Sequence, residues 1–222
     1  MIENRRITLT FDNGPTAGIT TKVLDVLARH DVRSTFFTIG RKLLDPNNSK
    51  LLPLIKGAGH WIGNHTWSHS VPFGENTDSA FAIAEIERAQ ELLGPYTEAT
   101  KLFRPYGKLG KLGPHVFSRA SLRHLKDNGF TTTTWTTVPG DMFHPDWDKD
   151  FQTRFPPRAW SVVVLHDVEN SCLSHLSDFI SRLKDSGYAF QQELPEEVIV
   201  TRDGRFINID RSLIADGVLS DD

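Results

Sequence analysis

The order of local patterns along the chain is the feature that most limits its fold. Apolar runs of strand length alternate with segments whose apolar residues recur at helical spacing. This alternation is typical of parallel sheets, because each parallel strand pair needs a crossover that a helix usually supplies. The predicted strands cover residues 7–11, 34–39, 60–64, 101–104, 130–137, 161–165 and 187–190. The clearer predicted helices are one that starts at 19 and is ended by His30-Asp31, and those over 51–58, 79–93, 116–128 and 173–184.

About seven such strands in 222 residues favour a distorted, incomplete (β/α) barrel over an open doubly wound sheet. No glycine-rich G-x-G-x-x-G fingerprint follows the first strand, which removes the main reason to expect a dinucleotide fold. We predict one domain over residues 1–222, with 193–222 forming a tail or a hairpin around Asp203-Gly204.

Charge and cysteine content narrow the classes of partner and of site. A net charge of −3 with 24% charged residues gives no sign of nucleic-acid binding or of attraction to an anionic membrane. Cys172 is the only cysteine, so an internal disulfide and a cysteine-rich metal site are excluded. Because no run has the length of a membrane span and the chain shows no apolar leader, we expect a cytoplasmic protein; secretion stays open if a leader has been trimmed.

The first strand ends in two polar residues, Asp12 and Asn13, directly before Gly14-Pro15. The carboxyl ends of parallel strands are where α/β proteins place their chemistry. Asp12 offers a group that can take a proton, and Asn13 offers a neutral oxygen that can face a cation. Alone, the pattern is more often a polar turn before a helix.

Two histidines, His65 and His69, follow the third predicted strand at a spacing of four residues. We expect this spacing to place both rings on one face of a helical turn, where they can reach one metal ion. An isolated pair is about as often a surface coincidence, but its place after a strand favours a metal site.

Two further strand ends carry candidate catalytic groups. Arg104-Pro105-Tyr106 ends one strand with a cation and a rigid turn, and Arg104 can pair with a carboxylate in the site. His166 ends the most hydrophobic strand, where a histidine is expected only if the strand end lines a pocket. His166 is therefore a candidate general acid, although a histidine with a purely structural bond at a strand end is equally common.

Together these stretches resemble the polysaccharide deacetylase family, which is named for the nodulation chitooligosaccharide deacetylase and classed among carbohydrate esterases. The resemblance covers about residues 7–190. Its five ordered motifs stand here as Thr10-Phe11-Asp12-Asn13-Gly14-Pro15, His65-Thr66-Trp67-Ser68-His69, Arg104-Pro105-Tyr106-Gly107, a region from Trp135 to Trp147, and Leu165-His166.

The resemblance implies a distorted barrel of parallel strands and metal-dependent hydrolysis of an N-acetyl amide on a sugar. By motif position, Asp12 matches the general base, His65 and His69 the metal-binding histidines, Arg104 the residue that orients the base, and His166 the general acid. Two histidine ligands make zinc the expected ion.

The resemblance also suggests which groups surround the substrate. A backbone N–H near Tyr106 would help to hold the oxyanion of the transition state. The side chains of Tyr106, Trp67, Trp135 and Leu165 are candidates for a wall that faces the sugar, while core packing is an equally common role for each aromatic residue.

Two motifs depart from the family pattern. Asn13 stands where the family usually has an aspartate as the third metal ligand; its neutral oxygen predicts weaker metal binding and a stronger Lewis acid. A family branch that acts on muramic residues of peptidoglycan also carries asparagine there. In the fourth motif, Asp141 or Asp146 is expected to support His166, and Asp141 is preferred because it is nearer the strand end.

The leading interpretation is a metal-dependent hydrolase that removes N-acetyl groups from amino sugars or N-acetylated oligosaccharides and polysaccharides. One alternative is hydrolysis of a small non-sugar amide or cyclic imide on the same fold. A second alternative is a catalytically silent carbohydrate-binding protein, in which Asn13 marks lost metal chemistry.

Overall fold

A computed structural model describes residues 5–76, 78–149, 151–155 and 158–215. The chain divides into two compact units. Unit 1 comprises Met1–Thr38, Lys42–Ile62 and Trp135–Pro195, and unit 2 comprises Ile39–Arg41, Gly63–Thr134 and Glu196–Asp222. The prediction of a single domain stays a prediction.

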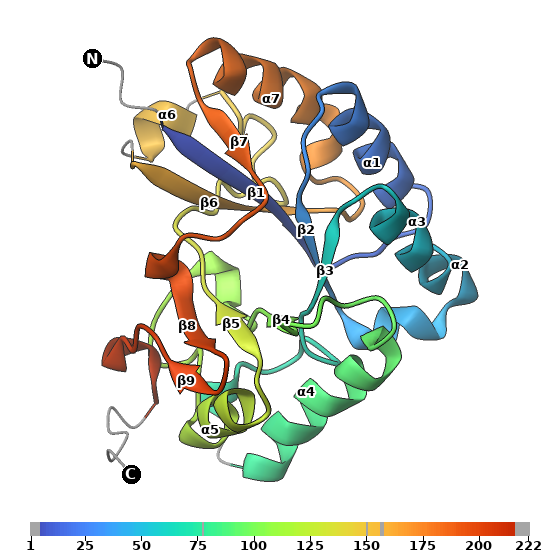
Figure 1. The fold of residues 1–222 in the computed structure, drawn as a ribbon. Coiled ribbons are helices and arrows are strands. Elements are labelled where there is room, and N and C mark those ends of the chain that lie inside the picture. Colours follow the sequence, from blue (N-terminus) through green and yellow to red (C-terminus); the bar gives the residue numbers. More distant parts are fainter. Residues whose placement is uncertain (1–4, 77, 150, 156–157, 216–222) are drawn as a thin grey trace. The chain divides into compact units, whose positions relative to one another are not determined.

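Unit 1 is organised around strand β1 (Arg6–Asp12), which forms parallel pairs on both of its edges (Figure 1). Strand β6 (Trp160–His166) pairs along the whole of β1. On the other edge, β7 (Ala189–Gln191) pairs with the first part of β1 and β2 (Thr35–Thr38) with the last part. The carboxyl ends of β1, β2 and β6 therefore meet at one end of unit 1.

The register of these strands decides which side chains share a face. Asp12 lies opposite His166 of β6, and Phe11 lies opposite Leu165. Because side chains alternate along a strand, Asp12 and His166 occupy one face while Phe11 and Leu165 occupy the other. Phe11 is fully buried and stacks on Phe36 of β2, with ring centroids 5.0 Å apart.

Two amphipathic helices of unit 1, α1 (Thr20–Arg29) and α7 (Leu176–Asp185), contact each other and lie side by side in Figure 1. Their apolar residues recur at helical spacing and are buried, which is the pattern expected of helices that cover a sheet. The shorter helices of this unit are α2 (Pro46–Ser49), α3 (Leu52–Gly57) and α6 (Phe151–Arg154), with a 3₁₀ helix η4 (Cys172–Ser174) before α7.

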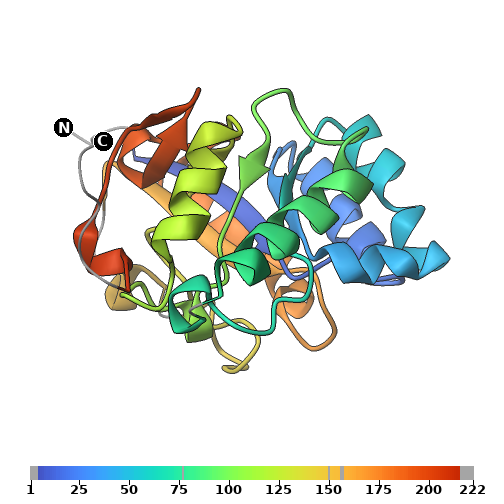
Figure 2. The same cartoon turned by 90° about the horizontal axis from the view of Figure 1, so that it is seen from below.

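Unit 2 contains the end of β3 (Trp61–Asn64), which forms a parallel pair with β4 (Leu102–Phe103). Strand β4 is in turn parallel to β5 (Thr131–Thr133). Helices α4 (Ser79–Leu93) and α5 (Arg119–Asp127) contact each other and lie side by side in Figure 2. A cluster of buried apolar residues, including Ile86, Phe103, Leu122 and Phe130, forms the core of this unit.

Strands β8 (Ile199–Arg202) and β9 (Arg205–Phe206) form the hairpin expected in the C-terminal segment. Its turn residues Asp203 and Gly204 have φ angles of 50° and 72°, which is the left-handed pair that a tight two-residue hairpin turn requires. The hairpin is confirmed, and β8 joins β5 in an antiparallel pair.

Strands β1 to β7 of the described residues all take part in parallel pairs, and helices alternate with them along the chain. The predicted α/β fold of the distorted, incomplete (β/α) barrel class is therefore confirmed. No helix in the described ranges has the length and apolar character needed to cross a membrane.

Several element boundaries differ from the expectation. The helix expected from Val116 begins at Arg119, because Ser118 caps its first turn by accepting the N–H of Ser121 at 3.2 Å. The strand expected to reach Thr137 ends at Thr133, and the N–H of Thr134 still donates to the carbonyl of Val198, the residue before β8.

Candidate active site

The carboxyl end of β1 presents Asp12 and Asn13. Asp12 is buried, with 4% of its surface exposed. Asn13 has a left-handed φ of 71°, which ends the strand and which asparagine tolerates better than most residues. Its amide nitrogen donates to the sulfur of Met142 at 3.8 Å, while its buried Oδ1 accepts no hydrogen bond from the described residues. An amide oxygen left in this state is suited to a cation.

His166, at the end of β6, is held by the carboxylate of Asp141. The backbone N–H of His166 donates to Asp141 Oδ2 at 2.9 Å, and its Nδ1 donates to Oδ1 at 2.8 Å. The side chain of Asp141 is fully buried and that of His166 is 13% exposed. Asp146, the other candidate, is exposed and forms an ion pair with Lys149 at 2.5 Å, so Asp141 is the residue that contacts His166.

The surroundings of His166 raise its pKa above the ordinary value. Burial of the ring acts to lower the pKa of His166, but the hydrogen bond to Asp141 and the charge of that carboxylate act in the opposite direction. The nearby carboxylates of Asp12 and Asp167 add to the upward effect. His166 is thus favoured in its protonated form, which is the form that a general acid needs.

The carbonyl of His166 is also fixed, because it accepts hydrogen bonds from Ser171 Oγ at 2.5 Å and Cys172 Sγ at 3.2 Å. Cys172 is fully buried in the 3₁₀ helix η4. Both contacts come from the loop after β6, so that loop holds the end of the strand.

Asp167 is a candidate positioning residue that the sequence did not single out. Burial raises the pKa of Asp167 to about 7, although the hydrogen bond from Thr20 lowers it. The hydroxyl of Thr20 donates to Asp167 Oδ2 at 2.6 Å. A Cβ placed on Gly14 would lie 2.1 Å from both carboxylate oxygens, so the turn after Asn13 packs directly on Asp167. Its place next to His166 was the signal available in the sequence.

In unit 2, His65 and His69 lie on a loop after β3, so the expected helical turn is wrong. Thr66 and His69 have φ angles of 64° and 52°, which no right-handed helix contains. The side chain of Asn64 accepts the N–H of Thr66 at 2.9 Å, and Thr66 Oγ1 accepts the N–H of His69 at 3.1 Å. These turns still bring the two imidazole rings together, with centroids 4.7 Å apart.

The backbone of Arg104 sets the tautomer of His65. Nδ1 of His65 lies 2.8 Å from the carbonyl oxygen of Arg104. Because a carbonyl only accepts, Nδ1 carries the proton and the lone pair of a neutral ring is on Nε2. Arg104 is itself fully buried, and its N–H donates to the carbonyl of Asn64 at 2.9 Å. A histidine oriented by a carbonyl in this way is the usual arrangement of a metal ligand.

The loop that carries His65 and His69, called the histidine loop below, is hydrogen bonded to the segment that contains Gly40 and Arg41. The N–H groups of Gly40 and Arg41 donate to the carbonyls of Thr66 and Trp67, each at 2.9 Å. A Cβ at Gly40 would lie 2.7 Å from Cβ of Ala89, so only glycine permits this close approach.

Helix α4 contacts the same loop through Glu85. The side chain of Glu85 is buried, and its Oε2 accepts the N–H of Ser68 at 2.8 Å. Its helical neighbours Phe81 and Ile83 are less buried, with Phe81 half-buried and Ile83 38% exposed. Helix α4 therefore turns Glu85 toward the loop that carries the two histidines.

The four residues predicted to face the sugar lie in different surroundings. Tyr106 lies against His69, with ring centroids 3.9 Å apart, and Trp67 lies under the guanidinium of Arg88 at 4.2 Å. Trp135 is 7% exposed. Leu165 is completely buried on the face of β6 opposite His166, so strand alternation turns it away from the acid.

The described side chains contain no group of three His, Cys, Asp or Glu residues that could hold a metal ion. The predicted ligand set is of another kind, with two imidazoles and the amide oxygen of Asn13. The protonated Nδ1 of His65 and the buried, unpartnered Oδ1 of Asn13 both fit such a donor set.

The sequence profile of the family described as polysaccharide deacetylase matches residues 2–133, more than half of the chain. The chain belongs to this family. It is 31% identical to the peptidoglycan-N-acetylmuramic acid deacetylase PdaA of Bacillus subtilis over 85% of this chain and 70% of that protein.

The chain is also similar to two peptidoglycan-N-acetylglucosamine deacetylases. The chain is 26% identical to the peptidoglycan-N-acetylglucosamine deacetylase PgdA of Listeria monocytogenes over 84% of its own length, and it spans only 38% of PgdA. Among solved structures, the Bc1960 peptidoglycan N-acetylglucosamine deacetylase superposes with a TM-score of 0.71 at 25% identity, covering 91% of this chain and 92% of that one.

Proposed function

We propose that the chain is a metal-dependent hydrolase that removes acetyl groups from N-acetylated amino sugars. The observation that carries the proposal is the strand register that places Asp12 opposite His166, with Asp141 bonded to the His166 ring. The carboxylate of Asp12 can serve as the base, and His166, which is favoured in its protonated form, can serve as the acid. Membership of the polysaccharide deacetylase family supports the choice of an acetamido substrate.

In this proposal His65, His69 and Asn13 hold one divalent ion, and zinc suits two imidazole ligands best. The carbonyl of Arg104 supports this role, because it accepts the proton on Nδ1 and so puts the lone pair of a neutral His65 ring on Nε2. When bound, the ion supplies Lewis-acid polarisation of the amide carbonyl and of the attacking water.

The residues of the chain would move the protons of the reaction. Asp12 takes a proton from the water whose oxygen attacks the amide carbon. His166 gives a proton to the nitrogen as the carbon–nitrogen bond breaks, so the products are acetate and a free amino sugar. Asp141 holds His166 for this transfer through the bond at Nδ1. A backbone N–H near Tyr106 is the candidate donor to the oxyanion.

A second candidate is carbohydrate binding without turnover. The observation that favours it is the left-handed backbone of Asn13, which gives asparagine a structural reason to be there without any metal. Binding of this kind would be indifferent to chelation.

The test is acetate release from N-acetylated glucosamine oligomers by the purified protein, with EDTA and then with added zinc. We expect release that EDTA abolishes and zinc restores. Sugar binding that EDTA leaves unchanged, with no acetate released at any zinc concentration, would establish the binding protein instead. A cyclic imide in the same assay tests whether a non-sugar amide is the better substrate.

A further inference from the structure

The turn after β1 lies against Asp167, the residue that follows β6. Asp167 is buried, and both of its carboxylate oxygens occupy the space that a Cβ on Gly14 would need. Gly14 is not among the glycines with a positive φ in the described part of the chain, so its backbone does not require left-handed freedom. The close approach of the Asp167 carboxylate therefore explains why glycine stands at this position.

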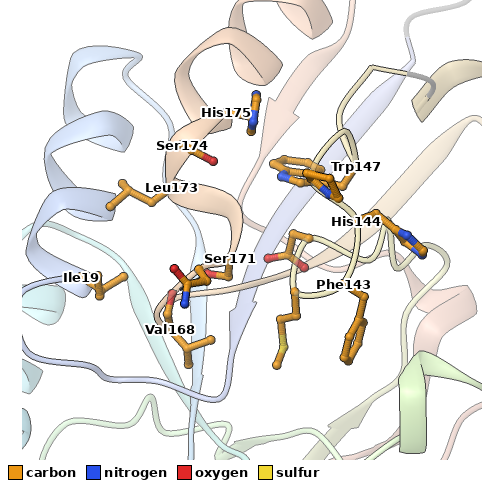
Figure 3. A pocket seen from close by; sticks show the side chains of 13 residues that line it. Ile19, Phe143, His144, Trp147, Val168, Ser171, Leu173, Ser174 and His175 are labelled. Atoms are coloured by element: carbon orange, nitrogen blue, oxygen red, sulfur yellow. Dashed lines mark hydrogen bonds between the residues drawn. The ribbon is translucent and has the colours of Figure 1, made fainter.

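The hydroxyl of Thr20 joins the same two segments. Thr20 is the first residue of α1 and is completely buried. Its Oγ1 donates to Asp167 Oδ2 at 2.6 Å and accepts the backbone N–H of Thr16 at 2.8 Å. Ile19 and Val168, which adjoin this hydrogen-bonded pair in the sequence, line one pocket of unit 1 (Figure 3). The loop between β1 and α1 is thus tied to the loop after β6.

The backbone at Asp167 is held without the help of Thr20. The carbonyl of His166 belongs to the peptide unit that leads into Asp167, and it accepts hydrogen bonds from Ser171 and Cys172. The pairing of β6 with β1 fixes His166 from the other direction. The side chain of Asp167 therefore extends from a fixed strand end to the turn after β1.

The side chain of Asn13, in contrast, has few contacts of its own. Among the described residues, its Nδ2 donates to the sulfur of Met142 at 3.8 Å, which is a weak acceptor, and its Oδ1 accepts no hydrogen bond. The direction of this amide is consequently set by the backbone turn of Asn13 and Gly14. Any shift of the turn would move the oxygen that is proposed to face the metal ion.

The burial of Asp167 is itself unfavourable. Its Oδ2 accepts the bond from Thr20, while its Oδ1 accepts no hydrogen bond from the described residues. Removing a polar oxygen from water without a full set of partners costs free energy. An apolar side chain would pack here without that cost, so the carboxylate indicates a polar task, which the bond from Thr20 supplies.

We propose that Asp167 and Thr20 are positioning residues that set where the amide oxygen of Asn13 lies relative to His166. The inference rests on the proposed function, in which Asn13 faces the metal ion and His166 protonates the leaving nitrogen. Asp167 separates the turn at Asn13 from the strand end at His166 by a fixed distance, and Thr20 holds Asp167 in that position. Neither residue is assigned a contact with the ion or the substrate.

The experiment measures zinc affinity by titration calorimetry and, in the metal-free protein, hydrogen–deuterium exchange over residues 13–20. Thr20→Val removes the hydroxyl and should lower zinc affinity about tenfold, the lower end of the range for groups that support metal ligands. Thr20→Ser keeps the hydroxyl and should retain the affinity, and Asp167→Ala should lower it at least as much as Thr20→Val. Thr20→Val and Asp167→Ala should both speed exchange over residues 13–20 and leave the histidine loop unchanged.

Thr8→Val is the matched control. Thr8 is completely buried near the start of β1, and its hydroxyl also makes two bonds, donating to the carbonyl of Glu193 at 2.7 Å and accepting the indole N–H of Trp160 at 3.0 Å. This variant should lower thermal stability without changing zinc affinity. A loss of zinc affinity in Thr8→Val equal to that in Thr20→Val would show a general loss of stability and would overturn the inference.

A second comparison asks whether Asp167 acts through Asn13. In the variant Asn13→Ala, the further change Asp167→Ala should cost no more zinc affinity, because the side chain that it positions is gone. Equal losses of zinc affinity from Asp167→Ala with and without Asn13 would also overturn the inference.

The exchange data separate this inference from the proposed function. If no form binds zinc or releases acetate, yet Thr20→Val and Asp167→Ala speed exchange over residues 13–20, the deacetylase proposal fails and these residues still position the turn. If zinc binds and acetate is released, but neither variant alters zinc affinity or exchange in this segment, the positioning role fails alone. Circular dichroism of each variant excludes loss of the fold as the cause.

Discussion

The two units carry their candidate catalytic side chains in different ways. In unit 1, Asp12 and His166 stand at the ends of two parallel strands that are hydrogen bonded in register. In unit 2, His65 and His69 stand on a loop whose left-handed residues no regular element would contain. The sheet therefore positions Asp12 and His166, whereas contacts to a loop position His65 and His69.

Because of this difference, we expect substitutions in the two units to impair different properties, proton transfer in unit 1 and metal binding in unit 2. A strand end is positioned by many backbone hydrogen bonds, so substitutions at His166 or Asp141 should alter proton transfer and leave the framework intact. The histidine loop depends on a few individual contacts, such as the bond from Ser68 to Glu85, so losing one contact should weaken metal binding. Substitutions in the two units can therefore be separated by measuring turnover and zinc affinity independently.

The largest effect is expected for His166→Ala. Removing the general acid should reduce turnover by roughly two or more orders of magnitude, because acid–base groups contribute on that scale. Bound zinc should be unchanged, since His166 is held by Asp141 and is not in the proposed ligand set. His115→Ala is the control: the Nε2 atom of His115 lies 3.1 Å from the carbonyl of Lys111, outside the proposed site, and its loss should affect neither readout. Loss of zinc in His166→Ala would assign this residue to the metal.

A smaller effect is expected for Glu85→Ala, which removes the acceptor for the Ser68 N–H. Zinc affinity should fall by about five- to tenfold, the scale of one lost buried hydrogen bond of roughly 1 kcal/mol. Glu85→Gln keeps an acceptor and should restore most of the affinity, and Glu91→Ala, on the exposed face of the same helix, should match the unchanged protein. If Glu85→Ala binds zinc normally, the loop does not depend on helix α4.

The smallest effect is a change in pH dependence for Asp141→Asn. The Asp141 carboxylate helps to raise the pKa of His166, and a general acid works only while it is protonated. Activity of the unchanged protein should therefore fall as pH rises through that raised pKa. Removing the negative charge lowers the pKa of His166, so the alkaline limb of the kcat/KM profile should move to lower pH. A limb that stays in place would show that the group titrating there is not His166.

The same comparison explains what the sequence could predict. The strand ends at Asp12 and His166 follow from hydrophobic runs that stop at a polar residue, and helix α4 has the predicted bounds Ser79–Leu93. The loop that carries His65 and His69 also depends on a contact distant in the chain, the bond from Ser68 to Glu85, and a glutamate on a helix is usually exposed to solvent.

Two other features of the site could not be predicted from the sequence, one because of strand geometry and one because of a backbone contact. Leu165, a candidate for the sugar-facing wall, directly precedes His166, and adjacent strand residues point to opposite faces. The tautomer of His65 depends on the carbonyl of Arg104, and no pattern of side chains reveals where a backbone carbonyl will lie.

We propose that Asn13, His65 and His69 hold a metal ion for hydrolysis. The most direct test is a zinc titration of the unchanged protein and of the variant Asn13→Asp. A carboxylate adds one full negative charge beside a divalent ion, so Asn13→Asp should bind zinc at least about tenfold more tightly. The unchanged protein should bind zinc weakly and release acetate from N-acetylglucosamine oligomers when zinc is supplied. Equal zinc affinity in the two forms would show that residue 13 is not a ligand, and no acetate from either form at saturating zinc would contradict the deacetylase.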